Sequence, residues 1–388
     1  MRMKMNKKLL LVLSLGMLFL TARAQDDEVA RYMFDGEHPV CLDELQRELD
    51  YPLAWGRSDI REFDLWRTAA RDRLRHEMLI PPKPAEKYDM KVVAEERRKG
   101  YKARRLALNI DAYSRVEAYE LIPDGEGPFP AVVLLHDHGG HFSIGKEKMI
   151  RPFAVADSIL ADADAWAVKC YDGQYVGDYL ASRGYVVLSI DAPFWGDRGV
   201  KGGTTWDMYK YIVGDFLMIG RNISSWMSFD DVYTVDFLAT LPEVDKERIG
   251  CMGFSMGGYR SWMLASLTDK VKAGVSICWM HTAEYQVNPQ HGLKQHEEWC
   301  YIIPGMRRYM DYPHIASIAC PKPMLFVNGS QDKLFPPISV NKAFAEMRAV
   351  WQSQGADDRL ETEIWDMPHY CGPKVQQRLL EFLDKHLR

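Results

Sequence analysis

Ser255 lies in a hexapeptide, GFSMGG at 253–258, that has the form Gly-x-Ser-x-Gly. An apolar run at 249–252 precedes it, and a stretch of helical character at 259–267 follows it. Glycines on both sides of a serine permit a sharp turn from strand to helix with the hydroxyl exposed at its tip. The N–H groups that begin the helix point toward any oxyanion formed beside that hydroxyl. We therefore predict that Ser255 is a nucleophile and that the N–H of Met256 is an oxyanion donor.

A serine nucleophile needs a base to take its proton and an acid to orient that base. Asp332 follows the apolar run 324–328, in a polar turn. His369 follows the run 361–365 and precedes a C-terminal helix. Nucleophile, acid and base then occur in the order Ser, Asp, His, which is typical of serine hydrolases with a parallel sheet. The spacing predicts Asp332 as the acid and His369 as the base.

Other readings of these residues remain open. Asp332 would alternatively cap a turn, and His369 would be a solvent-facing loop histidine. Asp366 competes as the acid, although it lies very near His369 along the chain. His386 competes as the base, although it falls inside the terminal helix.

The segment HDHGGH at 136–141 follows the apolar run 131–135, where this architecture places a second oxyanion donor. We assign that donor to the backbone N–H of His138. The spacing H-x-H-x-x-H also resembles zinc ligand spacing. The two glycines at 139–140 favour a loop that substrate can approach, and no carboxylate follows where a dinuclear site needs one. We expect no metal and no other cofactor.

The elements that must position these residues alternate between strands and helices. Three segments read as antiparallel strands, at 91–97, 102–108 and 116–122. Six compact apolar runs follow, separated by helical stretches, at 131–135, 186–190, 249–254, 271–277, 324–328 and 361–365. Such runs are typical of parallel strands covered on both faces. We predict an α/β fold with a mostly parallel central sheet, an antiparallel start and helices on both faces.

The domain organisation is predicted in three parts. Residues 1–24 combine early basic residues, an apolar run at 9–20 and small residues at 22 and 24, which indicates an export signal. A membrane span is the alternative, but the apolar run is short for crossing a bilayer. Residues 25–86 are expected to form a helical extension that packs on the catalytic domain, 87–388. We predict a protein secreted across the inner membrane, in the periplasm, without a membrane anchor.

About forty residues, 281–320, separate two adjacent predicted strands. They include the aromatic residues Trp299, Tyr301, Tyr309 and Tyr312 and several histidines. An insertion of that length above the carboxyl ends of strands is commonly a lid or a substrate-binding surface. An ordinary structural excursion is the alternative, and both readings stay open.

The bulk composition excludes some classes of partner. The chain has 388 residues, 47% of them hydrophobic, which is enough for one large core or two modest ones. A net charge of -5 provides no broad cationic surface, so nucleic acid is not expected as a partner. The seven cysteines are an odd number, so at least one is unpaired. Cys251 and Cys278 fall in or beside apolar runs and are expected to be buried as small apolar side chains.

At these motifs the chain resembles the α/β-hydrolase superfamily, in the branch of dienelactone-hydrolase-like and acetyl xylan esterase-like enzymes. The matching segments are 136–140, 190–193 with Asp191, 253–258, 328–332 and 368–369. The resemblance covers about residues 87–388 and implies exported bacterial carbohydrate esterases. Dienelactone hydrolases have a cysteine where this chain has Ser255, which favours ordinary ester hydrolysis. The oxyanion loop also lacks the three consecutive glycines of many lipases.

We predict a serine esterase that removes acetyl or methyl esters from plant polysaccharides such as xylan or pectin. Trp195, Trp299 and Tyr301 are candidates for stacking on sugar rings, and Arg198 and Arg260 for pairing with a uronic carboxylate. A serine exopeptidase or amidase is one alternative, although no propeller-like repeat restricts substrate size. A non-catalytic glycan-binding protein is another, and turnover that depends on Ser255 would exclude it.

Overall fold

The computed structural model describes residues 33–35, 38–287 and 299–388. The chain divides into two units, residues 1–49 with 288–290 and residues 50–287 with 291–388. In the first unit, β1 (Phe34–Asp35) pairs antiparallel with β2 (His38–Pro39), and a short helix α2 (Leu42–Arg47) follows. The predicted export signal at 1–24 lies outside the described residues.

The second unit is built on a nine-stranded sheet with the order β11-β10-β9-β8-β6-β7-β5-β4-β3. Its strands are β3 (Lys91–Arg98), β4 (Tyr101–Asn109), β5 (Arg115–Pro123), β6 (Phe129–Leu135), β7 (Val186–Ile190), β8 (Val244–Phe254), β9 (Ala273–Ile277), β10 (Met324–Gly329) and β11 (Leu360–Trp365). The pairs β3–β4, β4–β5 and β5–β7 are antiparallel, and the remaining pairs are parallel. The predicted α/β class, with its antiparallel start, is confirmed.

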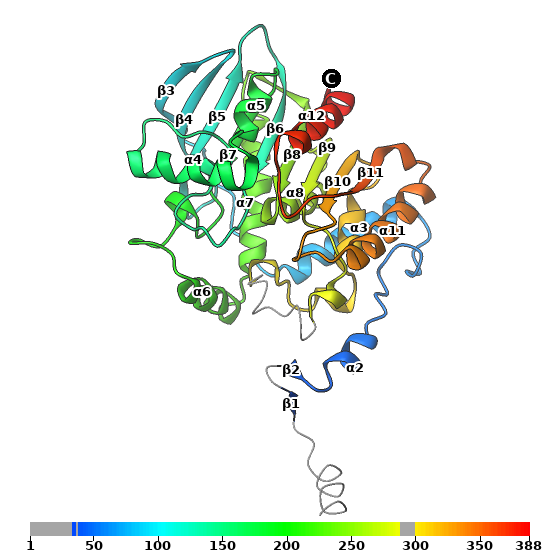
Figure 1. Ribbon diagram of the computed structural model, residues 1–388. Helices are drawn as coiled ribbons and strands as arrows, with labels where there is room; N and C mark the ends of the chain where they lie inside the picture. Colours follow the sequence, from blue (N-terminus) through cyan, green and yellow to red (C-terminus); the bar gives the residue numbers. More distant parts are fainter. Residues whose placement is uncertain (1–32, 36–37, 288–298) are drawn as a thin grey trace, which may run out of the picture. The chain divides into compact units, whose positions relative to one another are not determined.

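Helices cover both faces of this sheet (Figure 1). Successive residues of a strand point to opposite faces, so Val132 and Leu134 enter one hydrophobic core while Val133 and Leu135 enter the other. One face is covered by α4 (Asp157–Tyr171), α5 (Val176–Ala181) and α12 (Pro373–Leu387). The other carries α3 (Phe63–Glu77), α7 (Ile223–Leu238), α8 (Met256–Leu267) and α11 (Pro337–Ser353). This two-sided burial explains why the central strands are continuously apolar.

Helix α3 attaches part of the predicted N-terminal extension to the sheet unit. Trp66, Ala70 and Leu74 recur every four residues and are fully buried in the core. Arg71 on the same helix donates two hydrogen bonds, of 3.0 and 2.9 Å, to the carboxylate of Asp269. Within the helical extension expected over 25–86, the described helices are α2 and α3, with turns among the residues between them.

The insertion at 281–320 consists of short helical turns where it is described. These are η3 (Ala283–Tyr285), η4 (Trp299–Tyr301), η5 (Met306–Arg308), α10 (Tyr312–Ala316) and η6 (Ser317–Ala319). Its central part, 288–298, lies outside the described residues, and both readings of the insertion, lid or structural excursion, stay open. The remaining elements are η1 (Lys146–Lys148), η2 (Gly196–Arg198), α6 (Trp206–Met218) and η7 (Asp357–Arg359). No described helix combines the length and apolar character needed to cross a membrane.

Candidate active site

Ser255 occupies the turn between the end of β8 and the start of α8. Its backbone adopts φ 55° and ψ −122°, a conformation that residues other than glycine rarely adopt. Its N–H donates a 2.8 Å hydrogen bond to the carbonyl of Ile277 on the neighbouring strand β9. The turn is therefore strained and at the same time anchored to the sheet. The hydroxyl stands at the N-terminal end of α8, where the helix dipole favours negative charge.

The two glycines that flank the turn are required by close contacts. A Cβ on Gly253 would lie 2.1 Å from the carbonyl carbon of Gly257. A Cβ on Gly257 would lie 1.7 Å from the carbonyl oxygen of Leu135, the last residue of β6. The backbone at the start of α8 thus packs directly against the end of β6, the strand paired with β8. This close packing explains the glycines of the sequence motif.

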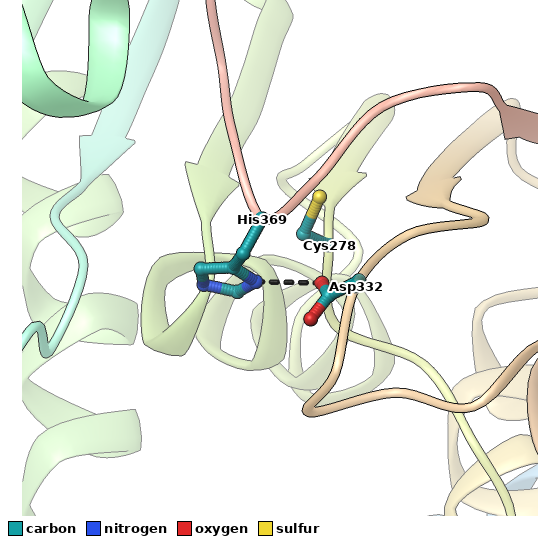
Figure 2. Close-up of side chains that lie close together, drawn as sticks. All are labelled: Cys278, Asp332 and His369. Atoms are coloured by element: carbon teal, nitrogen blue, oxygen red, sulfur yellow. Dashed lines mark hydrogen bonds and ion pairs between the residues drawn. The ribbon is translucent and has the colours of Figure 1, made fainter.

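His369 and Asp332 lie together on the loops after β11 and β10. The Nδ1 of His369 is 2.6 Å from Oδ2 of Asp332, and Figure 2 shows this bond. The other carboxylate oxygen accepts a 2.9 Å hydrogen bond from the N–H of Leu334, and the Asp332 side chain is fully buried. A buried carboxylate bound to Nδ1 holds the proton on that nitrogen, which leaves Nε2 as a hydrogen-bond acceptor.

Backbone hydrogen bonds join the two loops that carry this pair. The N–H of Ser330 donates to the carbonyl of Trp365 at 2.8 Å, and that of Gln331 donates to Met367 at 3.1 Å. The His369 ring also packs against the rings of Phe254, at a centroid distance of 4.7 Å, and Phe335, at 6.0 Å. The imidazole is thus held on its edge by Asp332 and on its faces by aromatic rings.

The competing acid and base lie elsewhere. Asp366 is exposed and accepts a 2.7 Å hydrogen bond from Nε2 of Gln331. His386 lies in α12, where its ring packs against Phe382 at 4.7 Å. Neither side chain lines the cavity that contains Ser255 and His369.

A cavity of about 290 Å³ opens beside Ser255. Its lining residues are His138, Gly139, Gly140, Trp206, Ser255, Trp279, Tyr301, Leu334, Phe335 and His369. The structure thus brings the predicted nucleophile, the predicted base and the predicted oxyanion loop to one cavity. Most of the other lining side chains are apolar or aromatic.

Two histidines of the oxyanion loop are held as neutral groups. The Nδ1 of His136 bonds the carbonyl of Asp137 at 2.9 Å, and its Nε2 accepts the N–H of Ala192 at 2.9 Å. Burial, aided by nearby Arg260, holds the pKa of His136 well below its usual value. The Nδ1 of His138 accepts the N–H of Gly140 at 3.0 Å, and burial lowers the pKa of His138 to about 3.

These contacts bear on the alternative of a zinc site at 136–141. Both ring nitrogens of His136 are committed to backbone groups, and Nε2 of His141 lies 2.6 Å from Oδ1 of Asp162. In the described ranges, one group of three side chains brings possible ligand atoms within 4.8 Å of one another: Cys278, Asp332 and His369 (Figure 2). Burial raises the pKa of the Cys278 thiol, which disfavours the thiolate that a metal would need.

A second serine, histidine and aspartate group joins Ser143 and His141, on the loop after β6, to Asp162 of α4. The Oγ of Ser143 is 3.2 Å from Nε2 of His141 and donates a 2.7 Å hydrogen bond to Oδ2 of Asp162. The His141 ring stacks on Trp166 at 4.7 Å with an interplanar angle of 8°. The three side chains are partly exposed to solvent, and none lines the cavity.

Four of the predicted substrate-binding residues do not line the cavity: Trp195, Arg198, Arg260 and Trp299. Trp195 is fully buried and donates from Nε1 to the carbonyl of His138 at 3.2 Å. Arg198 pairs with the buried Asp230 at 2.7 Å. Arg260 makes two hydrogen bonds, of 2.9 and 2.6 Å, to Asp231.

These three predictions are therefore corrected, because buried ion pairs and core packing occupy the side chains. Trp299 is half-buried in η4 and does not line the cavity, whereas Tyr301, the third predicted stacking residue, does. Sequence reasoning also missed Trp206 and Trp279. Trp279 follows β9 almost directly, which is the place where a parallel sheet presents site residues, so its position was a usable signal.

Comparison with known proteins places these observations in a family. The model of the Abhydrolase family matches residues 39–357. YtaP of Bacillus subtilis (strain 168), a predicted hydrolase, is 29% identical over 283 residues, which cover 73% of this chain and 87% of YtaP.

Two solved structures are similar in fold. A predicted acetyl xylan esterase from Bacteroides fragilis NCTC 9343 has a TM-score of 0.66 at 18% identity, over 83% of this chain and 80% of its own. The glucuronoyl esterase from Solibacter usitatus has a TM-score of 0.63 at 15% identity, over 87% of this chain and 97% of its own. Together with the family match, this likeness shows the α/β-hydrolase fold, as predicted.

Proposed function

Because this chain belongs to the Abhydrolase family, we propose that it is a serine carboxylic-ester hydrolase acting on acetyl or methyl esters of plant polysaccharide fragments. The observation that carries the proposal is the arrangement of three side chains. Asp332 holds Nδ1 of His369 at 2.6 Å, and His369 lines one cavity with Ser255, whose backbone is strained in the turn before α8.

The proposed reaction is acyl transfer in two steps. Nε2 of His369 takes the proton of Ser255 while Oγ bonds the ester carbonyl carbon. The tetrahedral intermediate collapses, the bond to the alcohol oxygen breaks, and His369 returns the proton to the leaving alcohol. Water then attacks the acyl-serine by the same route, which releases the carboxylic acid and restores the Ser255 hydroxyl. Asp332 keeps the imidazole in the tautomer that both steps need.

The oxyanion of each intermediate is proposed to bind the backbone N–H groups of Met256 and His138. In the described part of the chain neither N–H has a hydrogen-bond partner. They follow the ends of two neighbouring paired strands, since Leu135 of β6 lies opposite Gly253 of β8. Donors already in place when charge develops are a large source of rate enhancement.

The cavity favours a small uncharged ester. None of the residues that line it in the described structure is Asp, Glu, Lys or Arg. Trp206, Trp279 and Tyr301 provide aromatic surface of the kind that packs against sugar rings. Two proteins with this fold are an acetyl xylan esterase and a glucuronoyl esterase by name, which favours a carbohydrate ester. Export to the periplasm, predicted from residues 1–24, would place the enzyme where such fragments arrive.

The test is a substrate panel assayed with two serine variants. Wild type is incubated with acetylated xylan, methyl-esterified pectin oligosaccharides and dipeptide amides, and release of acetate, methanol or amine is measured. We expect ester hydrolysis that Ser255→Ala lowers by at least about 10⁴-fold without loss of the folded state. Ser143→Ala is the matched control and should retain wild-type rates.

Each outcome separates one class of function. Amine release dependent on Ser255 would indicate an amidase. Glycan binding with no turnover of any ester, including an activated acetate ester, would indicate a binding protein. Full activity of Ser255→Ala would reject the mechanism.

A further inference from the structure

Lys148, the last residue of η1, is buried beneath the proposed oxyanion loop. Its side chain has no solvent exposure. Its Nζ donates 3.0 Å hydrogen bonds to two successive backbone carbonyls, those of Asp137 and His138. A lysine that binds adjacent peptide groups in this way holds the backbone of the loop directly.

The ammonium group forms one buried ion pair, with Asp137, at a distance longer than a hydrogen bond. Oδ1 of Asp137 lies 3.6 Å from Nζ, beyond hydrogen-bond distance. Oδ2 of Asp137 instead accepts from Tyr171 Oη at 2.7 Å and Trp166 Nε1 at 3.2 Å. Burial lowers the pKa of Lys148, and the Asp137 carboxylate opposes this effect. The shortest contacts of the buried ammonium are therefore with the peptide carbonyls.

Lys146, on the same short helix η1, has different partners. It is equally buried, but its Nζ lies within 2.8 Å of the carboxylates of Glu147, Asp191 and Asp197. Lys146 thus joins side chains of separate segments. Lys148 contacts the backbone that carries the proposed oxyanion donor.

Because peptide groups are planar, these contacts with the carbonyls also set the direction of the N–H groups in the same peptides. The carbonyl of Asp137 and the N–H of His138 belong to one planar trans peptide, so they point in opposite directions. That carbonyl is held from two sides, by Lys148 and by Nδ1 of His136 at 2.9 Å. The carbonyl of His138 is likewise held by Lys148 and by Trp195 Nε1 at 3.2 Å. Fixing both carbonyls fixes the N–H groups of His138 and Gly139, two residues that line the cavity.

We propose that Lys148 is a positioning residue, whose ammonium group orients and polarises the peptide that donates the His138 N–H to the oxyanion. The inference rests on the proposed function, since it assigns a role within that reaction. A positive charge on the carbonyl side draws electron density through the peptide and strengthens the N–H as a donor. The effect is largest in the transition state, where the substrate oxygen carries negative charge.

The test uses Lys148→Gln, which keeps one amide donor, and Lys148→Met, which keeps none. Turnover of 4-nitrophenyl acetate and inhibition by methylboronic acid are measured. Ser255 Oγ bonds to boron while His369 takes the hydroxyl proton, and the boron becomes a tetrahedral anion, so the adduct probes the oxyanion site without ester turnover. Tyr171→Phe is the matched control, because it removes a buried hydrogen bond to Asp137 and leaves both carbonyl contacts in place.

We expect kcat to fall on the order of ten-fold in Lys148→Gln and further in Lys148→Met, with KM within about twofold. The inhibition constant of methylboronic acid should rise by the same factor as kcat falls. Tyr171→Phe should lower the melting temperature but change kcat and the inhibition constant by less than about twofold. A purely structural role would lower the melting temperature of the lysine variants without this parallel change.

The inference is overturned if folded Lys148→Gln retains kcat within twofold of wild type. It is also overturned if Tyr171→Phe lowers kcat as much as Lys148→Gln does. Lys148→Gln decides the matter should Lys148→Met not fold. If Ser255→Ala is inactive while the Lys148 variants keep full activity, the role of Lys148 is rejected and the proposed function stands. Esterase turnover that survives Ser255→Ala would instead reject the proposed function.

Discussion

Two histidines in this protein each lie 2.6 Å from an aspartate oxygen: His369 beside Asp332, and His141 beside Asp162. The contacts use different ring nitrogens. Asp332 binds Nδ1 of His369 and leaves Nε2 for another partner, whereas Asp162 binds Nε2 of His141, the nitrogen that Ser143 also approaches. A relay needs acid and nucleophile on opposite nitrogens. The second group therefore has all three residue types without the arrangement that catalysis requires.

The serines of the two groups also differ, in backbone conformation and in hydrogen-bond partner. Ser255 is held at φ 55° before a helix, with its side chain at the cavity. Ser143 has no left-handed backbone and donates its proton to Asp162. A carboxylate that accepts the hydroxyl proton directly stabilises the ground state and provides no base of suitable strength for acyl transfer. The comparison teaches that hydrogen-bond topology, and not proximity, distinguishes a relay from a surface network.

The largest difference between the two groups is expected when the aspartate of each is replaced by asparagine. Asp332→Asn should lower kcat/KM for an acetate ester by about 10⁴-fold, because an amide no longer holds the imidazole in the required tautomer. Asp162→Asn is the matched variant, and its kcat/KM should stay within about twofold of wild type. Equal losses in both variants would contradict the distinction between the groups.

A smaller effect is expected in the pH dependence of stability. Burial lowers the pKa of His138 to about 3, while an unfolded histidine titrates near 6.5. The unfolded state therefore binds the proton first, so the free energy of unfolding falls as pH decreases from about 6.5 toward 3. The contribution of one such histidine is at most about 1.4 kcal/mol per pH unit.

The variant His138→Asn tests this dependence, since its amide oxygen can accept the Gly140 N–H but does not titrate. Urea unfolding at several pH values between 4 and 7 should give a shallower slope than in wild type, whatever the absolute stability. An unchanged slope would show that His138 is not held neutral by the fold.

The smallest effect is expected from chelation. Cys278 lies beside His369 and Asp332, and its three-residue group has the spacing of metal ligands. In the proposed mechanism the thiol only packs, so incubation with EDTA should leave kcat/KM within about twofold. Cys278→Ala should cost about 1 kcal/mol of stability, as expected for a small buried cavity. Loss of activity on chelation, restored by Zn²⁺, would make this group a metal site and not a relay.

The fold was largely predictable because its signals are local. Most strands of the sheet unit are apolar or alternating runs bounded by turn residues, and the predicted boundaries differ from the observed ones by a few residues. The run expected at 249–254 begins earlier, at Val244. The turn at Ser255 was predictable for the same reason, because Gly253 and Gly257 are the residues that its backbone contacts demand.

The surroundings of the site were not predictable to the same extent. Arg198 and Arg260 read as candidates for binding a substrate carboxylate, but their partners Asp230 and Asp231 lie on α7, far away in sequence. Lys148 reads as a surface residue, since lysine is rarely buried. Its partners are backbone carbonyls, which every residue has, so the sequence does not reveal these contacts.

The amino-acid sequence by itself determined the order of strands and helices, the strained serine turn and the residue types of the proposed relay, since these depend on neighbours along the chain. Only the tertiary structure decided which ring nitrogen meets which carboxylate, which aromatic side chains reach the cavity and which cations are buried. Those features are contacts between segments brought together by folding. Their energies depend on distances of a few ångströms that no local pattern encodes.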